Sequence, residues 1–308
     1  MAPRVCIVTL NWRGIEDTLG CLESLRQLAY PNFQVVVVDN GSGDDSVPCI
    51  ADRYPEVDLV ETGANLGFAG GCNVGIRRAL ERGADYLWLL NSDTWVDANA
   101  LTAMVELAEG DSALGAVGSV ICDQAAPERI LAWGGGWVDL RRGCPSHALA
   151  PVEGTELDYL TGASLLLRAR ALAEVGLLDE RFFLYWEETD LCFRLRGHGW
   201  KLGVAPDSRV WHRAPGASLR RLRQKDRHFN ASAVRFLFRY APHPWSAGLI
   251  GGAVPLGQRP APGAGRVRAS AGGAPGNPGG VARTPFLSAG SRPDTCRWRE
   301  HEAGRGCA

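Results

Sequence analysis

The chain has 308 residues, of which 45% are hydrophobic and 22% are charged, and its formal net charge is −1. This length allows one large domain or two modest ones. A near-neutral chain lacks the basic character that nucleic acid attracts, so we expect no nucleic-acid partner. Nine cysteines at scattered spacings, without a CxxC pair, predict buried free thiols in a reducing compartment rather than a disulfide framework.

No apolar run in the sequence has the length of a transmembrane helix. The nearest, residues 245–256, is short and is interrupted by glycine and proline. The first apolar run ends at Asn11, which is too early for the hydrophobic region of a signal peptide. We therefore expect a cytoplasmic protein, with the inner face of the membrane as an alternative location.

Residues 5–122 alternate short β-rich runs with runs of helical periodicity. The pattern predicts strands at residues 5–10, 35–38, 58–61, 86–90 and 116–122, and helices at residues 15–28, 47–54, 73–82 and 98–109. This alternation is typical of an α/β fold with a Rossmann-like, mostly parallel central sheet and helices on both faces. Ligands of such sheets bind beyond the carboxyl ends of the strands, so we expect the functional residues there.

The second half of the chain is less regular. Residues 129–152 predict an antiparallel ribbon or a loop, residues 201–212 predict two short strands around Pro206, and residues 219–240 predict a basic amphipathic helix. Beyond residue 255, Gly, Ala, Pro and Arg dominate, which predicts a disordered C-terminal tail. We therefore expect a folded domain over residues 1–245, followed at 246–308 by an apolar stub and this low-complexity tail.

Two segments are candidates for nucleotide binding. Asp39 follows a run of four valines, and Asn40, Gly41 and Ser42 can form a tight turn whose amides approach a ligand. An ordinary turn with a capping aspartate explains the same residues equally well. The glycine-rich segment 65–75 precedes a predicted helix, which suits phosphate or sugar contact, although a flexible loop is a serious alternative.

Four acids and a histidine are candidates for the chemistry at a diphosphate. Asp93 ends the segment Asn91-Ser92-Asp93 after an apolar strand, where a carboxylate can hold a divalent cation; a turn aspartate is the alternative. His212 follows the last predicted strand and becomes a candidate metal ligand only if the fold brings it to Asp93. An acidic cluster at a predicted helix start follows a run of aromatic residues, which favours a general base over a helix cap alone; its members are Glu187, Glu188 and Asp190.

Taken in this order, the segments resemble family 2 glycosyltransferases with the GT-A fold, and most of all the rhamnosyltransferase-like enzymes of bacterial cell-surface polysaccharide assembly. The matching stretches are IVTLNW, VVVVDNGS, NLGFAGGCNVGI, LLNSD, LTGASLLLRAR, GLLDERFFLYWEETDLCFRL and VWH. They cover residues 4–240 approximately. The resemblance implies an inverting hexosyltransferase that moves a sugar, with rhamnose as a candidate, from a nucleoside diphosphate sugar to a glycan or lipid-linked acceptor.

The resemblance also implies roles for single residues. Asp93 occupies the last position of the family's Asp-X-Asp motif and, with His212, would hold Mg²⁺ or Mn²⁺. Glu188 stands where the family usually has the aspartate that acts as base, so Glu187 or Asp190 could share that role. The nucleotide pocket would contain Asn11, Asp39, Asn40, Gly41, Asn65, Gly67 and Asn73, and the acceptor site would contain Gly162 and Trp186.

Two other functions fit parts of the pattern. A nucleotidyltransferase would also use a sugar nucleotide, a metal and an α/β sheet, but the first strand lacks a basic glycine-rich loop after it. A nucleotide-sugar-binding module without catalysis is the other alternative, and the acidic cluster argues against it. The basic segment 219–240 fits peripheral membrane contact as well as an ordinary amphipathic helix.

Overall fold

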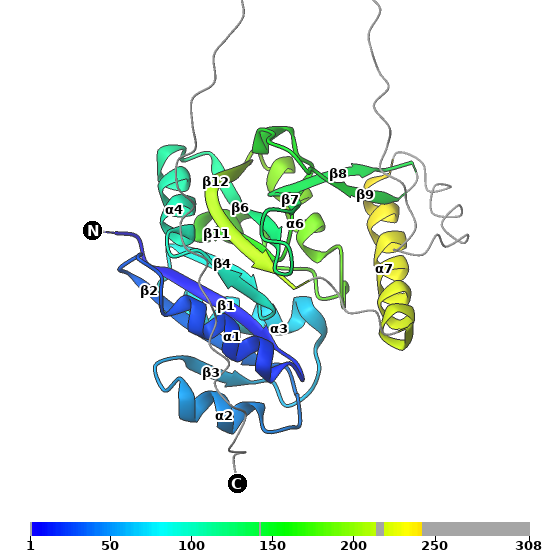
Figure 1. Ribbon diagram of the computed structural model, residues 1–308. Coiled ribbons are helices and arrows are strands. Elements are labelled where there is room, and N and C mark those ends of the chain that lie inside the picture. Colours follow the sequence, from blue (N-terminus) through cyan, green and yellow to red (C-terminus); the bar gives the residue numbers. More distant parts are fainter. Residues whose placement is uncertain (1, 142, 214–218, 242–308) are drawn as a thin grey trace, which may run out of the picture. The chain divides into compact units, whose positions relative to one another are not determined.

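The computed structural model describes residues 2–141, 143–213 and 219–241, so the predicted stub and tail at 246–308 lie outside the described residues. Within them, nine strands form one large sheet (Figure 1). These strands are β1 (Val5–Asn11), β2 (Phe33–Asp39), β3 (Asp58–Glu61), β4 (Tyr86–Asn91), β5 (Thr94–Val96), β6 (Leu114–Asp123), β7 (Ile130–Trp133), β11 (Ser164–Arg168) and β12 (Lys201–His212).

The strand order in the large sheet is β3-β2-β1-β4-β11-β6-β12-β5, with β7 paired to β6. Strands β1 to β4 are parallel to one another, and β6 and β12 run in the same direction, whereas β5, β7 and β11 run against them. The predicted mostly parallel sheet is therefore confirmed. Its consequence is that β1, β2, β4, β6 and β12 all end at the same edge, where β11 begins.

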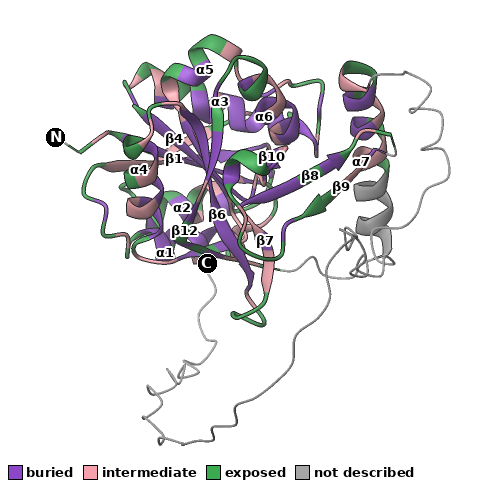
Figure 2. Ribbon diagram, turned by 90° about the horizontal axis from the view of Figure 1, so that it is seen from above, coloured by how far each residue is buried: buried purple, intermediate pink, exposed green. Residues whose placement is uncertain are grey.

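Seven helices are described, and they cover both faces of the large sheet: α1 (Ile15–Leu25), α2 (Ser46–Arg53), α3 (Gly67–Glu81), α4 (Ala100–Gly110), α5 (Ala169–Val175), α6 (Glu187–Gly197) and α7 (Leu219–Tyr240). The strand period of two explains the arrangement. Val36 and Val38 pack in one core with α3, α5, α6 and α7, and Val37 packs in the other with α1, α2 and α4. Figure 2 shows the buried strands between helices that have exposed outer surfaces.

Helix α3 begins at Gly67 and not at Asn73, so the segment that we expected to be a glycine-rich loop is mostly helix. The glycines allow the helix to lie close against the sheet. A Cβ at Gly71 would be 2.5 Å from Leu10 Cδ1, and one at Gly75 would be 2.4 Å from Val8 Cγ1. The packing of the helix on β1 and β2 therefore outweighs the low helix propensity of glycine.

Residues 201–212 form one strand, β12, rather than two short strands around Pro206. The register with β6 shifts between Ala205 and Arg209, so a bulge accommodates the proline, which has no N–H to donate. Residues 129–152, expected to form an antiparallel ribbon or a loop, contain antiparallel strands: β7, which pairs with β6, and the pair β8 (Gly135–Asp139) and β9 (Cys144–His147). After the 3-10 turn Gly154–Glu156, β10 (Tyr159–Leu160) pairs with β8 and completes a small three-stranded sheet.

The cysteines and the membrane prediction can be compared with the described residues. Among the described cysteines, Cys6, Cys21, Cys72, Cys122 and Cys192 are buried thiols outside any disulfide, as predicted. Among the described residues, no helix has both the length and the apolar character that crossing a bilayer requires. The apolar run at 245–256 lies outside the described residues.

Candidate active site

The carboxyl ends of β1 and β2 carry a buried polar network. Asn11 and Asp39 are neighbours across the two strands, and Asn11 Nδ2 donates to Asp39 Oδ1 at 2.7 Å. Ser42 contributes two further donors, its hydroxyl to Oδ1 at 2.5 Å and its backbone N–H to Oδ2 at 3.0 Å. A carboxylate offers about four acceptor positions, so Asp39 retains roughly one for a ligand.

The turn after β2 and the start of α3 lie against each other. Asn40 Nδ2 donates to the Gly67 carbonyl at 3.0 Å and to Asn65 Oδ1 at 3.2 Å. Gly41 has a φ of +70°, and a Cβ there would be 2.6 Å from the Ala64 carbonyl carbon. The turn is thus packed on the protein itself, and the N–H of Asn40 donates to the Asn11 carbonyl rather than to open space.

Asp93 and His212 meet at the same edge of the sheet. Asp93 lies in the turn between β4 and β5, His212 ends β12, and His212 Nε2 is 3.0 Å from Asp93 Oδ1. Asn91 Nδ2 is 3.4 Å from the same ring nitrogen. The fold therefore brings His212 to Asp93, as its role as a candidate metal ligand requires.

The donor chemistry of this pair fits a divalent cation. Carboxylate oxygen and imidazole nitrogen both bind Mn²⁺ and related ions. Adjacent ligands of an octahedral ion with bonds of about 2.1 Å lie about 3.0 Å apart, which is the Asp93–His212 spacing. Within the described residues, no group of three or more His, Cys, Asp or Glu side chains could hold a metal. The pair would therefore leave coordination positions for a diphosphate and water.

The acidic cluster stands at the start of α6, as predicted. Tyr185 and Trp186, directly before it, have φ values of 69° and 76°, which are costly for residues with a side chain. This sharp turn ends the loop and starts the helix at Glu187. Glu187 is 4% exposed, whereas Glu188 is partly exposed. Burial raises the pKa of both carboxyls, and the charge of Glu188 raises the pKa of Glu187 further.

Glu188 is connected to the other site residues through the segment before β11. A Cβ at Gly162 would lie 3.5 Å from Glu188 Cγ, so the glutamate side chain rests on the Gly162 backbone. The next residue, Ala163, accepts a hydrogen bond from the Asn91 N–H at 3.1 Å. The base candidate and the metal-binding candidates therefore border the same sheet edge, as do Asn11 and Asp39.

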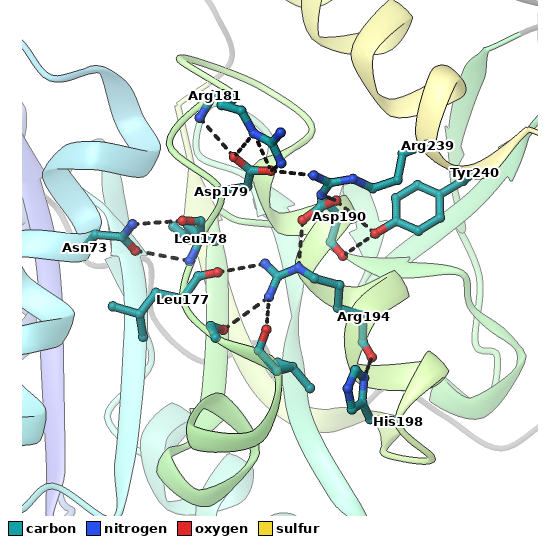
Figure 3. Close-up of polar contacts among 12 residues, drawn as sticks. Asn73, Leu177, Leu178, Asp179, Arg181, Asp190, Arg194, His198, Arg239 and Tyr240 are labelled. Atoms are coloured by element: carbon teal, nitrogen blue, oxygen red, sulfur yellow. Dashed lines mark hydrogen bonds and ion pairs between the residues drawn. The ribbon is translucent and has the colours of Figure 1, made fainter. Parts of the chain in front are cut away.

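Asp190, unlike the two glutamates, is bound by arginine side chains, and Figure 3 shows these contacts. Its buried carboxylate accepts from Arg194 Nε at 2.8 Å, from Arg239 Nη1 at 2.5 Å and from the Tyr240 hydroxyl at 2.9 Å. Arg239 also bonds Asp179 at 2.8 Å, so α7 is fastened both to α6 and to the loop before it. A carboxylate with three such donors is held as an ion pair, and we remove it from the candidates for the base.

The comparison with family models decides the class of the protein. The model of glycosyl transferase family 2 matches residues 4–175 of the sequence. The chain belongs to this family. It is a glycosyltransferase that takes its sugar from a nucleotide-sugar donor, and the inverting mechanism fits this family. The nucleotidyltransferase alternative is thereby removed.

Two curated glycosyltransferases from Mycobacterium tuberculosis are similar to the chain. The N-acetylglucosaminyl-diphospho-decaprenol L-rhamnosyltransferase is 31% identical over 215 residues, which cover 62% of this chain and 70% of that protein. Galactofuranosyltransferase GlfT1 is 31% identical over 222 residues, which cover 69% of this chain and 71% of that protein. These similarities agree with the rhamnosyltransferase-like subgroup that the sequence resembles.

A solved structure supports the fold of this glycosyltransferase. The mannosyltransferase PcManGT from Pyrobaculum calidifontis, solved in complex with GDP-Man and Mn²⁺, superposes with a TM-score of 0.58 at 19% sequence identity. The match covers 81% of this chain and 70% of that one. At this identity the likeness concerns the fold alone, and it confirms the GT-A architecture.

Two residues predicted for the glycosyltransferase site lie elsewhere. Asn73 is buried on α3, where its amide bonds the backbone N–H and carbonyl of Leu178, so it anchors the loop before α6 rather than facing a nucleotide (Figure 3). Trp186 is 2% exposed and packs on Phe229 and Phe236 of α7, which leaves it no surface for an acceptor. Both positions depend on how the loop at 176–186 folds back.

Sequence reasoning missed the residues that hold Asn11 in place. The Thr18 hydroxyl on α1 donates to Asn11 Oδ1 at 2.8 Å, and Ser42 Oγ accepts from Asn11 Nδ2 at 3.1 Å. Ser42 stands in the quoted VVVVDNGS segment and could have been included for its position near Asp39. Thr18 has no comparable signal, because it lies in the middle of an ordinary amphipathic helix.

Proposed function

We propose that this glycosyltransferase transfers a hexose to a hydroxyl group of a lipid-linked glycan, with inversion at the anomeric carbon and with a divalent cation. The named activities of the two mycobacterial relatives support this class, since one of them adds L-rhamnose to a decaprenol diphosphate-linked N-acetylglucosamine. Rhamnose from a thymidine diphosphate donor is our first candidate. An acceptor of this kind lies in a membrane, so we extend the proposal to peripheral contact at its cytoplasmic face.

The donor would lie along the carboxyl ends of β1, β2 and β4. We assign the nucleoside to Asn11 and Asp39, which form a rigid, buried polar floor. We assign the cation to Asp93 and His212, with the diphosphate completing its coordination. When bound, the cation would neutralise the negative charge that develops on the departing diphosphate.

Glu188 is our candidate for the general base. Its carboxylate takes the proton of the acceptor hydroxyl while that oxygen forms a bond to the anomeric carbon and the bond from this carbon to the diphosphate oxygen breaks. The proton ends on Glu188, and the electron pair of the broken bond ends on the diphosphate. The observation that carries the assignment is the contact between Glu188 and Gly162, beside the segment that bonds Asn91.

The experiment is a panel of nucleoside diphosphate sugars, including dTDP-rhamnose, assayed with Mn²⁺ and a polyprenyl diphosphate-linked N-acetylglucosamine. Glu188→Gln keeps the shape of the side chain but cannot accept the proton, so kcat should fall by about a hundredfold or more while donor affinity stays within about twofold. Glu187→Gln is the matched control and should lose far less. Near-normal turnover of Glu188→Gln would disprove the assignment, and donor binding without turnover of the unaltered protein would indicate a binding module.

A further inference from the structure

Glu187 is a buried acid that the proposed reaction does not use. Glu187 is 4% exposed, and its Oε2 atom is buried without a hydrogen-bond partner. The Oε2 atom of Glu188 is also buried and has no hydrogen-bond partner. Taking an ionised carboxylate out of water without a compensating partner is strongly unfavourable. Two adjacent carboxyls in this situation make the state in which both are ionised more unfavourable still, because their charges repel each other.

The groups that face the two glutamates carry no compensating charge. Cys72 on α3 lies near Glu187, and Tyr159 on β10 and Cys192 on α6 lie near Glu188. Burial raises the pKa of all three groups, that of Cys192 to about 12, so they are neutral at pH 7. From α7, Phe229 and Phe236 pack against the preceding Trp186.

The nearby cations are already bound to another acid. Arg194 of α6 and Arg239 of α7 both bond the carboxylate of Asp190, at 2.8 Å and 2.5 Å (Figure 3). In the described part of the chain, neither Glu187 nor Glu188 forms an ion pair. Only backbone N–H groups favour an anion here: one, that of Glu187 itself, does so at Glu187, and four, those of Glu188, Thr189, Gly162 and Trp186, do so at Glu188.

We propose that the Glu187–Glu188 pair carries one proton and one negative charge at neutral pH, with Glu187 as a neutral carboxylic acid beside an ionised Glu188. The consequence for catalysis rests on the proposed function of Glu188 as the base. An ionised Glu187 would hold a proton on Glu188 and block it. A neutral Glu187 leaves Glu188 free to accept the acceptor proton, so Glu187 acts as a positioning residue that sets the charge state of its neighbour.

Protein stability tests the protonation state without any activity assay. A glutamate has a pKa of about 4.3 in the unfolded chain. If Glu187 keeps its proton in the folded protein, the folded state binds one proton more than the unfolded state between pH 5 and pH 8, so wild-type stability falls with rising pH. Glu187→Gln lacks this proton. The urea midpoint of Glu187→Gln minus that of the wild type should therefore increase steadily from pH 5 to pH 8.

The control variant is Glu180→Gln, on the same loop. Bonds from Asn73 and Arg77 lower the pKa of Glu180, so its replacement should give a midpoint difference from wild type that does not vary between pH 5 and pH 8. A pH-independent difference for Glu187→Gln would overturn the proposal. Infrared spectroscopy gives a second readout: the carbonyl band of a protonated carboxyl should be present in the wild type at pH 7 and absent in Glu187→Gln. Its absence from the wild type would also overturn the proposal.

The pH dependence of kcat/KM separates this inference from the base assignment. Gln resembles a neutral carboxylic acid, so Glu187→Gln should keep the acidic limb of the profile at the wild-type position. If Glu187 were ionised, its removal would move that limb down by about 1 pH unit or more, which would contradict the inference. The effect of Glu188→Gln on turnover concerns only the base, whereas the stability and infrared results report the proton that the pair carries and the acidic limb reports that it lies on Glu187.

Discussion

At the scale of single residues, the proposed metal dependence rests on the contact between Asp93 and His212. The two side chains come from different strands and lie 3.0 Å apart. Asp93→Asn removes the carboxylate from this pair and leaves an amide, which is a poorer ligand. Even outer-shell substitutions around bound metals cost about 10-fold to 100-fold in affinity. We therefore expect Asp93→Asn to weaken Mn²⁺-dependent binding of a nucleoside diphosphate by at least about tenfold, measured by calorimetry.

Asp97→Asn is the matched control for this prediction. Asp97 lies four residues further along, just past the end of β5, and its Oδ1 accepts a hydrogen bond from the Asn99 N–H at 2.8 Å. The same change of a carboxylate to an amide there should leave Mn²⁺-dependent binding within about twofold, since surface substitutions away from a site have small effects. Unchanged binding in Asp93→Asn, or an equal loss in both variants, would contradict the metal assignment.

At the scale of elements, the glycines of α3 set the distance between this helix and the sheet. A Cβ at Gly75 would be 2.4 Å from Val8 Cγ1, and the β-branched Val8 is buried and cannot move aside freely. Overpacking of this kind costs about 1–3 kcal/mol, which exceeds the gain of about 1 kcal/mol from helix propensity. Gly75→Ala should therefore lower the free energy of unfolding in urea.

The control for Gly75→Ala is Gly110→Ala, at the last residue of α4. An added Cβ at Gly110 meets no atom within 4 Å, so the substitution has no steric cost. Because alanine has the higher helix propensity, the free energy of unfolding should rise or stay unchanged. Equal effects in the two variants would show that the approach of α3 to β1 does not depend on the missing side chain.

The same elements show what the sequence could predict and what it could not. Continuous apolar runs predicted the buried strands, because a strand that is buried on both faces is apolar at successive positions, as in residues 35–38. The start of α3 was missed because tertiary packing overrode the propensity of glycine. Asp93 and His212 could be predicted as site residues because each follows a predicted strand. The orientation of the Asn73 and Trp186 side chains could not be predicted, because it depends on a loop that has no periodic pattern.

At the scale of the whole molecule, the candidate site extends beyond the part that matches the family model. That match ends at residue 175, before Glu187 and Glu188 on α6 and before His212 on β12. Helix α7 lies later still, yet its Ala233 and Phe236 belong to the core of the domain and its Leu237 is buried as well. We therefore propose that the catalytic domain includes α7 and ends near residue 245.

This domain boundary predicts a contrast between two shortened chains. A chain of residues 1–255 should keep its melting temperature within about 2 °C, since a change of 1 kcal/mol shifts a domain of this size by about 2–4 °C. A chain of residues 1–218 loses α7 and with it the burial of Phe236 and Leu237, each worth about 1.5–3 kcal/mol. Its melting temperature should fall by at least about 6 °C. A large loss in the longer chain would show that residues beyond 255 pack on the domain.

Because the shorter chain can fail to fold, two single substitutions on α7 keep the prediction decisive. Phe236 is fully buried and contacts Trp186, Phe193 and Tyr240, so Phe236→Ala should cost about 3–5 kcal/mol in the unfolding free energy. Phe238, two residues further along the same helix, is 64% exposed, and Phe238→Ala should change it by less than about 0.5 kcal/mol. If both variants were as stable as the wild type, α7 would not be part of the domain. A loss in Phe236→Ala alone would mean that the turn at Trp186, from which Glu187 and Glu188 extend, depends on a helix beyond the matched family region.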